Sequence, residues 1–358
     1  MNNLTIKSNT KKYKVIFEKD FNSLKKLTFD NKATSVIDKN VYKIYSSELI
    51  KNNFNPNDII LFDAKEKNKT FKGASKIYRE LLSRNFKKNV RLIVIGGGIT
   101  QDVTGFVAST LYRGIEWYYI PTTLLSQADS CIGSKTSLNF ETYKNILGTF
   151  YPPSSVHIYT DFLHTLSESN FISGIGEVIK LKIMKEEASK NFELIANEIR
   201  NASLNKNNLR LMIKNSLLTK ISYIEDDEFD KGRRNLLNYG HCFGHAIEVS
   251  SNYRIPHGIA VIIGMIFANI VSFKRGLIRS DIFDYINKNI FLPYVKIKYT
   301  VDMFSEEKLI EAMKKDKKRI GSDLTIILMD NKYGFIKVDD LKEIEFKKSL
   351  NILIDILF

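Results

Sequence analysis

A chain of 358 residues of which 44% are hydrophobic is long enough for two hydrophobic cores, so two domains are expected. Lysine and arginine total 54 against 40 acidic residues, a net charge of +14. The cations are scattered among acids and form no aromatic-interleaved basic stripe, which argues against nucleic-acid binding and favours a solvated surface with some cations gathered for an anionic small substrate. Two cysteines, Cys131 and Cys242, exclude a disulfide framework and fit a reducing compartment.

The chain has no sequence feature typical of membrane insertion or secretion. Its N-terminal residues carry charges without the apolar segment of a signal peptide. The longest apolar run, residues 259–273, is interrupted by Asn269 and is too short to span a bilayer. We therefore expect a cytoplasmic protein that contacts no membrane.

The first half of the chain has the pattern of an α/β fold. Apolar, β-branched runs at residues 13–17, 33–37, 59–62, 90–95 and 117–120 are typical of buried strands. Residues 72–89 place Ala74, Ile77, Leu81, Leu82 and Phe86 at helical spacing, which predicts an amphipathic helix. Such alternation indicates an open sheet with helices on its faces.

A triple glycine follows the fourth of these runs. Gly96, Gly97 and Gly98 allow the backbone to approach a ligand closely, and the helix expected after them offers N–H groups to phosphate. The stretch is a candidate nucleotide site. It is not a Gly-x-Gly-x-x-Gly motif, and a plain turn from strand to helix is the alternative.

Residues 120–150 are polar and are expected to be rich in loops. They supply hydroxyls, cations and amides where sheet ends commonly carry binding sites, with a polar surface loop as the alternative. The side chains concerned are Thr122, Thr123, Asp129, Lys135, Asn139, Lys144 and Asn145.

The second half has mainly helical periodicity. Helices are predicted within residues 174–200, 209–223, 261–273, 280–289 and 305–315, and a strand at 324–328. Residues 314–319 form a basic cluster, either a solvated loop or a binding element, and residues 333–358 show strand and helix patterns typical of a packed segment.

Three of the five histidines lie close together in the sequence. His241 and His245 are four residues apart and share one face of a helix, which is metal-ligand spacing. His257, between a proline and a glycine, is expected in a turn that could fold back toward them. Capping or core histidines are the alternative. Together with Glu177, His241 and His257 make up a His₂Glu set, typical of a catalytic zinc site.

The motifs resemble those of the sugar phosphate cyclase family, and of its 3-dehydroquinate synthases most closely. The resemblance runs from Asp38 to Arg319 and rests on GGGITQDVTGFVAS, YRGIEWYYIPTTLLSQADSCIGSKT, KNILGTFYPP, GIGEVIK and RRNLLNYGHCFGHAIE followed by HG. It implies an N-terminal Rossmann-like α/β domain that binds NAD, here residues 1–163. It also implies a mostly helical domain, residues 164–358, that holds a divalent metal, with the active site in the cleft between them and a homodimer as the assembly.

The resemblance also implies roles for individual residues. Glu177, His241 and His257 correspond to the ligands of Zn²⁺ or Co²⁺, and His245 to a catalytic residue and not a ligand. NAD contacts are implied for Asp38, Glu66, Lys69, Gly97, Gly98, Asp102, Thr122, Thr123 and Asp129. Lys135, Lys180 and Arg234 complete the catalytic set, and substrate binding is implied for Arg113, Lys144, Asn145, Lys220, Asn238 and Lys317.

The reaction implied is the conversion of 3-deoxy-D-arabino-heptulosonate 7-phosphate to 3-dehydroquinate and phosphate. NAD oxidises a hydroxyl, phosphate is eliminated, the hydride returns, the ring opens and an aldol addition closes the carbocycle. The metal acts as a Lewis acid and Lys135 stabilises a developing oxyanion. Arg113, Lys144, Asn145, Asn238 and His245 bind the phosphate. Arg234 suits the substrate carboxylate, with Lys220 and Lys317 as further charge.

The loop before Asn145 departs from the pattern of these synthases. Where they commonly have GGKTGVNHPLGKN, this chain has GSKTSLNFETYKN, with Ser134 and Ser137 in place of glycines. Phe140, Glu141 and Tyr143 replace histidine, proline and glycine. Outside the loop, Ser167 replaces a proline and Cys242 a threonine. A reshaped pocket could select another substrate.

Three alternative functions remain open. Other cyclases act on sedoheptulose 7-phosphate or glucose 6-phosphate, which lack a carboxylate, so Lys220 and Arg234 argue against them. A metal-dependent alcohol or polyol dehydrogenase shares the architecture but does not need so many cations. A non-catalytic basic binding protein is supported by the net charge alone.

Overall fold

The computed structural model describes residues 3–28, 33–141, 143–185, 191–202, 206–314 and 323–358, and the chain divides into two compact units. The first unit comprises residues 1–166 and 224–229, and the second comprises 167–223 and 230–358. The boundary expected after residue 163 takes no account of residues 224–229, which pack with the first unit.

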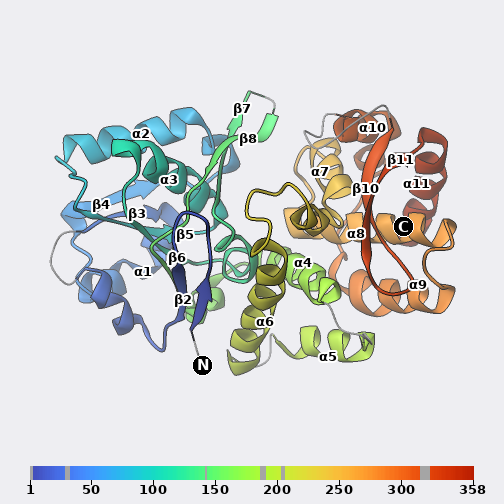
Figure 1. Cartoon of the computed structure of the whole chain (residues 1–358), viewed down its shortest axis with the longest axis horizontal. Coiled ribbons are helices and arrows are strands. Elements are labelled where there is room, and N and C mark those ends of the chain that lie inside the picture. Colours follow the sequence, from blue (N-terminus) through green and yellow to red (C-terminus); the bar gives the residue numbers. More distant parts are fainter. Residues whose placement is uncertain (1–2, 29–32, 142, 186–190, 203–205, 315–322) are drawn as a thin grey trace. The chain divides into compact units, whose positions relative to one another are not determined.

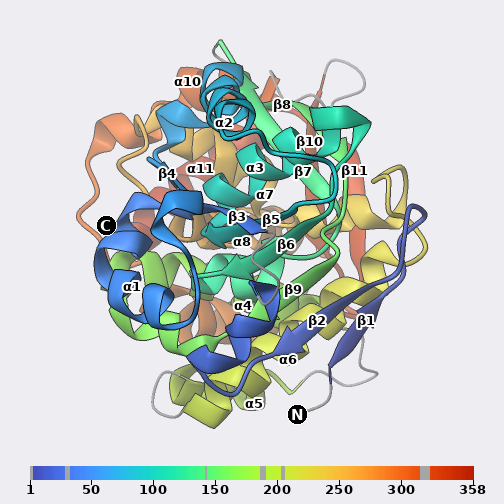
Figure 2. The ribbon, with the colours of Figure 1, turned by 90° about the vertical axis from the view of Figure 1, so that its left-hand side faces the viewer.

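A seven-stranded sheet forms the first unit, in the order β1, β2, β9, β6, β5, β3, β4 (Figure 2). Only the β1–β2 pair is antiparallel among these neighbours. The five predicted strands are confirmed to within one residue at each end. The bounds are β1 (Leu4–Ile6), β2 (Tyr13–Phe17), β3 (Ala33–Asp38), β4 (Ile59–Phe62), β5 (Arg91–Gly96), β6 (Trp117–Pro121) and β9 (Ser155–Ile158).

The order of the sheet reverses at β3. From β3 the chain passes through α1 (Lys39–Lys51) to β4 on one side, then through α2 (Phe71–Ser83) to β5 on the other, and α3 (Gly98–Thr110) leads on to β6. Helices α2 and α3 lie on one face of the sheet and α1 on the other (Figure 1). The connections that follow β3 and β5 therefore run in opposite directions along the sheet. Open α/β sheets bind ligands at the carboxyl ends of the strands where such a reversal occurs.

Helix α2 is shorter than predicted. The apolar periodicity continues to Phe86, but the helix ends at Ser83 because Asn85 adopts a left-handed conformation with φ 54°. The N–H of Phe86 then donates to the carbonyl of Leu81 at 3.0 Å, and its ring is 3% exposed. Phe86 is therefore buried as part of the helix C-terminal turn and not of the helix itself.

Residues 135–140 and 143–150 form the two strands of a β-hairpin, so the expectation of loops is wrong for these residues. β7 (Lys135–Phe140) pairs antiparallel with β8 (Tyr143–Phe150). Thr136 and Leu138 of β7 are buried, whereas Lys135, Ser137 and Asn139 are not, which is the alternation of a strand with one face packed. β7 packs against α3 and places its polar side chains beside that helix.

The second unit is mainly helical. Its helices are α4 (Glu168–Met184), α5 (Phe192–Ala202), α6 (Lys206–Ile224), α7 (His241–Ser250), α8 (His257–Lys274), α9 (Ser280–Ile286), α10 (Glu306–Lys314) and α11 (Glu343–Leu357). An antiparallel pair, β10 (Leu324–Met329) and β11 (Phe335–Leu341), completes it. The fold class, a Rossmann-like α/β region followed by a mostly helical one, is confirmed.

Helix α8 is the centre of the second unit, with α4, α7, α11 and β10 packed against it. Among the described residues it alone is long and apolar enough to cross a membrane, and 83% of it is buried inside the fold. Its apolar surface thus forms protein core. His257, expected in a turn, is instead the first residue of α8, and Pro256 before it is the N-cap residue with the extended conformation usual at that position.

The helical pattern of residues 174–200 belongs to two helices. Helix α4 ends at Met184 and Lys185 is extended, with φ −60° and ψ 128°. The next described helix begins at Phe192. Periodicity persists across the break because both helices bury an apolar face.

Candidate active site

The carboxyl ends of β3 and β5 carry the first predicted NAD contacts. Asp38 is the last residue of β3, and its carboxylate accepts a hydrogen bond from the N–H of Asn40 at 2.8 Å. Burial raises the pKa of Asp38 above its ordinary value. Gly97 precedes α3, and a Cβ on it would lie 2.9 Å from Thr123 Cγ2. A side chain here would therefore displace Thr123, whereas glycine leaves the backbone close to helix N–H groups suited to phosphate.

The neighbouring strand β6 brings the threonines to the same edge of the sheet. The N–H of Thr122 donates to the carbonyl of Gly96 at 3.0 Å, and Thr123 Oγ1 lies 2.8 Å from Ser126 Oγ. Asp129 lies in the π-helical turn Ser126–Ser130 that follows. The segment after β6 thus continues the site begun by the glycines.

Hairpin β7–β8 adds a second polar group to the first unit. Lys69 Nζ lies 2.5 Å from Asp102 Oδ2 and 2.7 Å from Asn145 Oδ1. Ser137 Oγ lies 3.0 Å from each of the same two oxygens. Residues predicted for NAD, Lys69 and Asp102, and one predicted for substrate, Asn145, are therefore joined in one network.

The remaining predicted residues of the first unit surround this network to different degrees. Glu66 Oε1 accepts from Asn139 Nδ2 at 2.8 Å and lies 3.9 Å from Lys144 Nζ. Lys135 is exposed at the start of β7. Arg113 is exposed in the turn after α3, where its φ is 62°.

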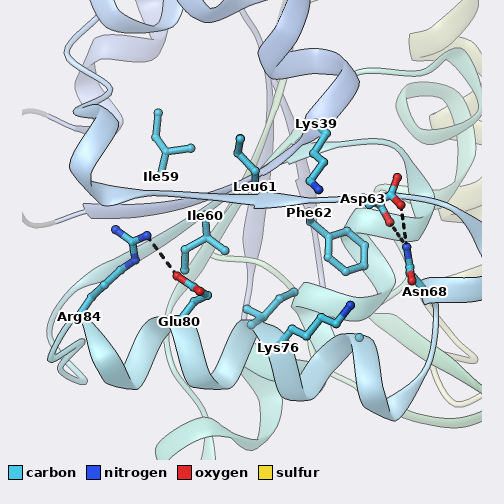
Figure 3. A pocket seen from close by; sticks show the side chains of 12 residues that line it. Lys39, Ile59, Ile60, Leu61, Phe62, Asp63, Asn68, Lys76, Glu80 and Arg84 are labelled. Atoms are coloured by element: carbon cyan, nitrogen blue, oxygen red, sulfur yellow. Dashed lines mark hydrogen bonds and ion pairs between the residues drawn. The ribbon is translucent and has the colours of Figure 1, made fainter.

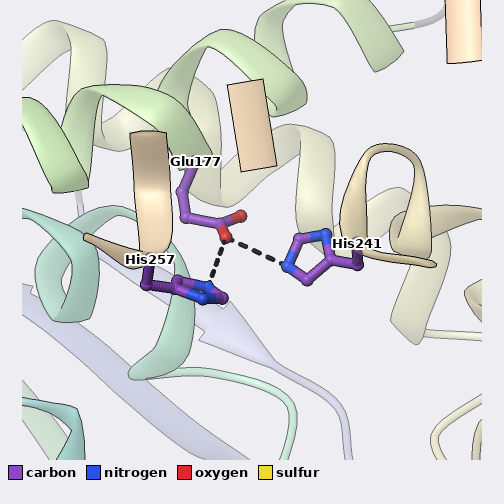
Figure 4. A group of neighbouring side chains, drawn as sticks. All are labelled: Glu177, His241 and His257. Atoms are coloured by element: carbon purple, nitrogen blue, oxygen red, sulfur yellow. Dashed lines mark hydrogen bonds and ion pairs between the residues drawn. The ribbon is translucent and has the colours of Figure 1, made fainter. Parts of the chain in front are cut away.

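In the second unit, three helices bring Glu177, His241 and His257 together (Figure 4). Glu177 Oε1 lies 3.1 Å from His241 Nε2 and 3.2 Å from His257 Nε2. Glu177 lies in the middle of α4, while the two histidines are the first residues of α7 and α8. The three predicted metal ligands, separated by up to 80 residues, therefore converge.

These three residues fit a divalent metal ion. Ligand atoms about 2.1 Å from a tetrahedral ion lie about 3.4 Å from one another, close to the spacing seen here. The second nitrogen of each ring also has a partner, since His241 Nδ1 lies 3.3 Å from the carbonyl of Tyr239 and His257 Nδ1 lies 3.3 Å from Glu248 Oε2. Such partners orient metal-binding imidazoles.

Lys180 adds a positive charge beside this group. Its Nζ lies 2.6 Å from Glu177 Oε2, and both side chains are almost fully buried. Burial alone would raise the pKa of Glu177, but the ammonium of Lys180 and then His241 bring it well below its usual range. Glu177 is therefore an ionised carboxylate, as a metal ligand must be.

The two histidines differ in their proton affinity. Burial and the charge of Lys180 lower the pKa of His241, which favours the neutral ring. Burial opposes protonation of His257 too, but hydrogen bonds to the Glu177 and Glu248 carboxylates raise its pKa to about 10. His241 is thus neutral in its own environment, whereas His257 is held by two acids.

Other predicted residues of the second unit lie on three elements. His245 is exposed on α7, and its ring centroid is 5.3 Å from that of His241 and 5.8 Å from that of His257. Lys220 on α6 and Arg234 in the 3-10 helix Arg233–Asn238 are 7% and 4% exposed. Asn238 Nδ2 donates to the carbonyl of Asn235 at 2.7 Å. Lys317 lies outside the described residues.

Two residues of these groups are absent from the prediction. Glu248 lies seven residues after His241 on the same helix face, and this spacing is a signal that could have identified it. Ser137 offers no such signal, because its partners come from separate parts of the chain.

A cavity of about 420 Å³ lies elsewhere in the first unit, between β4 and α2 (Figure 3). Its described lining includes none of the predicted site residues. Four of its polar groups pair with each other, Arg84 with Glu80 at 3.2 Å and Asn68 with Asp63 at 3.1 Å. The cavity is therefore separate from the candidate site.

Known structures support the same fold. ValA, a 2-epi-5-epi-valiolone synthase from Streptomyces hygroscopicus subsp. jinggangensis solved with NAD⁺ and Zn²⁺, is 23% identical and superposes with a TM-score of 0.84, covering 96% of this chain and 97% of that one. A 2-deoxy-scyllo-inosose synthase complexed with carbaglucose-6-phosphate, NAD⁺ and Co²⁺ is 22% identical, with a TM-score of 0.82 and coverage of 98% and 99%.

Sequence comparison identifies the family. Residues 59–173 match the family model described as 3-dehydroquinate synthase N-terminal, and residues 174–319 match the one described as 3-dehydroquinate synthase C-terminal. A 3-dehydroquinate synthase of Dictyoglomus turgidum is 38% identical over 360 residues, which cover 99% of this chain and 98% of the relative. The resemblance inferred from the motifs is thereby confirmed, and the chain belongs to the 3-dehydroquinate synthase family.

Proposed function

We propose that this protein is a 3-dehydroquinate synthase that converts 3-deoxy-D-arabino-heptulosonate 7-phosphate to 3-dehydroquinate and phosphate, using bound NAD and Zn²⁺ or Co²⁺. The observation that carries the proposal is the convergence of Glu177, His241 and His257 at family motif positions, with ligand atoms within 4.8 Å of one another. The full-length similarity to a named synthase supports the same activity.

NAD, when bound, supplies a reversible hydride acceptor, and the divalent metal supplies a Lewis acid. In the proposed site Glu177, His241 and His257 hold the metal. Lys180, whose Nζ is 2.6 Å from Glu177 Oε2, keeps that carboxylate ionised. Lys135 places a positive charge where an oxyanion develops, and His245 provides a ring nitrogen for proton transfer.

The substrate carries two anionic groups, and the proposal assigns different residues to each. Arg234 has a planar guanidinium that can donate two parallel hydrogen bonds to a carboxylate, with Lys220 and Lys317 as further cations. Arg234 and Lys220 are 4% and 7% exposed, so an anion bound to them is shielded from water. The phosphate is assigned to Arg113, Lys144, Asn145, Asn238 and His245.

The NAD assignment follows the carboxyl edge of the sheet. Gly97 and Gly98 hold the pyrophosphate at the N-terminus of α3, and Asp38 at the end of β3 accepts hydrogen bonds from ribose hydroxyls. Thr122, Thr123 and Asp129 contact the dinucleotide from the segment after β6. Glu66, Lys69 and Asp102 contact it from the side of α2 and α3.

Phosphate release by purified, zinc-loaded protein with NAD tests the proposal. The substrates 3-deoxy-D-arabino-heptulosonate 7-phosphate, sedoheptulose 7-phosphate and glucose 6-phosphate are supplied in parallel. We expect release from the first alone, no net formation of NADH, and loss of activity in His257→Ala. His164→Ala serves as the control, because His164 is an exposed histidine of the first unit.

Other outcomes identify the alternatives. Release from either of the other sugars would mean that the changed loop around Ser134–Tyr143 has altered the substrate, and that Arg234 binds no carboxylate. Net NADH formation with an alcohol would indicate a dehydrogenase. A protein that binds neither NAD nor metal would contradict the enzymatic proposal altogether.

We further propose that the enzyme acts in the cytoplasm as a homodimer. Burial of α8 within the fold and the two non-disulfide cysteines are compatible with a reducing, aqueous compartment. Arg113 resembles a family arginine that reaches the substrate phosphate, in some members from the partner subunit, and this resemblance supports the dimer. Sedimentation of the purified protein measures its oligomeric state directly.

A further inference from the structure

The hydroxyl of Ser137 joins four elements of the first unit. Ser137 lies in β7, Asn145 in β8, Asp102 in α3, and Lys69 directly after the 3-10 turn Glu66–Asn68. Ser137 Oγ is 3.0 Å from Asp102 Oδ2 and 3.0 Å from Asn145 Oδ1. Lys69 Nζ contacts the same two oxygens at 2.5 and 2.7 Å. The Lys69 ammonium can donate to both oxygens at once, whereas the Ser137 hydroxyl has one proton and donates to one of the two oxygens at a time.

This arrangement determines how the Asn145 amide is turned. Its oxygen accepts from the Lys69 ammonium, and it accepts from the Ser137 hydroxyl when the single hydroxyl proton is turned toward it. Rotation of the amide by half a turn would place its NH₂ group against the ammonium, with two donors facing each other. The backbone is held as well, because the N–H of Asn145 donates to Asn139 Oδ1 at 2.9 Å. The amide nitrogen is thus the end of the side chain directed away from Lys69.

The Asn145 amide is held less firmly by Lys69 alone than by Lys69 together with Ser137. The ammonium is shared with the Asp102 carboxylate, which is the stronger acceptor because it is charged, and which lies nearer. Without the hydroxyl, the ammonium can shift toward Asp102 and leave the amide oxygen with a weakened contact. Because the ammonium already binds Asp102 at 2.5 Å, the one proton of Ser137 is left for the amide oxygen, to which Ser137 donates from the opposite strand of the hairpin.

We propose that Ser137 is a positioning residue that, together with Lys69, turns the Asn145 amide so that its NH₂ donors face the phosphate of the substrate. The inference rests on the proposed function, in which Asn145 contacts that phosphate. Ser137 itself touches neither substrate nor cofactor in this assignment. Its hydroxyl acts through Asn145, and it couples the phosphate-binding strand β8 to Asp102 of the dinucleotide site.

The test compares zinc- and NAD-loaded protein with Ser137→Ala, Ser137→Thr, Asn145→Ala and the Ser137→Ala/Asn145→Ala double variant. Calorimetric binding of inorganic phosphate and the steady-state KM and kcat for phosphate release are measured. For Ser137→Ala we expect the phosphate Kd and the KM to rise about fivefold, with kcat changed by less than about twofold. Ser137→Thr, which keeps the hydroxyl, restores both constants. In the Asn145→Ala background, Ser137→Ala adds no further loss.

Thr149→Val is the matched control, because Thr149 lies on the same hairpin and its Oγ1 bonds Thr136 Oγ1 at 2.8 Å without contacting Asp102 or Asn145. If Thr149→Val weakened phosphate binding equally, Ser137 would serve only hairpin stability and the inference would be wrong. An unchanged Kd in Ser137→Ala, an undiminished effect without Asn145, or no phosphate binding by the unaltered protein would also overturn it. Failure of the proposed function alone would give a different result. Inorganic phosphate would bind and its Kd would change in Ser137→Ala, but 3-deoxy-D-arabino-heptulosonate 7-phosphate would release no phosphate.

Discussion

At the scale of single residues, Glu248 determines the orientation of the ring of His257, a proposed metal ligand. It is 6% exposed, and its Oε2 lies 3.3 Å from His257 Nδ1 while the other ring nitrogen faces Glu177. A carboxylate in this position fixes the tautomer of the imidazole and increases its basicity. We therefore expect Glu248 to contribute to the proposed metal site without being one of its ligands.

Substitution of Glu248 is expected to weaken metal binding. Glu248→Gln keeps a neutral acceptor and should lower zinc affinity about tenfold, and Glu248→Ala, which removes it, about a hundredfold. Competition with a chromophoric chelator measures both values. Glu345→Gln is the control, since that carboxylate pairs with Arg275 at the surface of the same unit at 2.7 Å. Equal zinc affinity in all three variants would contradict the role of Glu248.

Ser134 shows a second effect at this scale, a strained backbone combined with a buried hydrogen bond. Its φ is 64°, a left-handed conformation that costs a non-glycine residue about 1 kcal/mol. Its hydroxyl donates to Glu228 Oε1 at 2.6 Å, and the other oxygen of Glu228 accepts from the N–H of Asn9 at 2.6 Å. Hydrogen bonds to a buried charge contribute about 2 kcal/mol each.

The two effects can be separated by two substitutions of Ser134. Ser134→Ala loses the hydrogen bond and keeps the strain, so the free energy of unfolding should fall by about 2 kcal/mol. Ser134→Gly loses the hydrogen bond but relieves the strain, so its free energy of unfolding should fall by only about 1 kcal/mol. Urea titration of both variants measures the difference. A glycine variant less stable than the alanine variant would show that strain at residue 134 is negligible.

At the scale of elements, the metal group depends on how closely α4 approaches α8. Gly176 precedes Glu177 and Gly258 follows His257, so a glycine stands beside a proposed ligand on each helix. A Cβ on Gly176 would lie 2.3 Å from the carbonyl oxygen of Gly258, and one on Gly258 would lie 1.8 Å from that of Ser173. The glycines of these two motifs are therefore required by helix packing.

Gly176→Ala should separate the two helices. The contact is with backbone and cannot be relieved by a side-chain rotation, so we expect a loss of roughly 3 kcal/mol in stability. Zinc content of the purified protein should fall too, because Glu177 moves with α4. Gly276→Asn is the control, since nothing lies within 4 Å of a Cβ there and asparagine tolerates its φ of 67°. Full zinc content in Gly176→Ala would contradict the link between packing and ligation.

At the scale of the whole molecule, the free energy of unfolding should depend on pH through a buried chain of hydrogen bonds in the first unit. His157 Nδ1 lies 2.7 Å from Glu18 Oε1, and His157 Nε2 lies 2.7 Å from Ser155 Oγ. Burial lowers the pKa of His157 below its ordinary 6.5, against the opposing effect of Glu18. Burial raises the pKa of Glu18, but His157 and Lys26 more than compensate and bring it below its ordinary 4.5.

Both shifts act in the same direction. In each case the unfolded chain binds a proton at a higher pH than the folded one, so stability falls on acidification. The contribution of His157 is complete above pH 6.5 and is lost as the pH falls toward its folded pKa; that of Glu18 is lost below pH 4.5. Chemical denaturation between pH 7.5 and 5, values chosen to bracket the ordinary histidine pKa of about 6.5, measures the first effect.

His157→Gln should flatten the pH dependence of stability in this window, because glutamine bonds the same neighbours and has no proton to gain. His164→Gln is the matched control, since His164 is 64% exposed. An unchanged slope in His157→Gln would show that the pKa of the buried histidine does not differ between the folded and unfolded states.

The periodicity of the sequence alone determined most of the secondary structure. The five strands of the first half are recognisable because buried parallel strands need continuous apolar, β-branched runs. Helix ends were less accessible: α2 stops where Asn85 turns left-handed, and the apolar pattern continues past it to Phe86. Hairpin β7–β8 was missed, because its polar side chains resemble those of a loop and its pairing joins residues on both sides of a turn.

The motifs also identified the family and a set of expected metal ligands, because only a few side chains, such as histidine and glutamate, can bind a divalent metal. Spacing alone paired His241 with His245, which are one helical turn apart. The residue types suggested a His₂Glu set of Glu177, His241 and His257, and the resemblance then assigned His245 to catalysis and not to the metal. The tertiary structure decided which donors converge: the packing of α4, α7 and α8 brings Glu177 and His257 together across 80 residues. It also revealed Ser137 and its contacts with Asp102 and Asn145. Local periodicity depends on neighbours within one turn of chain, whereas a site depends on contacts that only the packed helices and hairpin create.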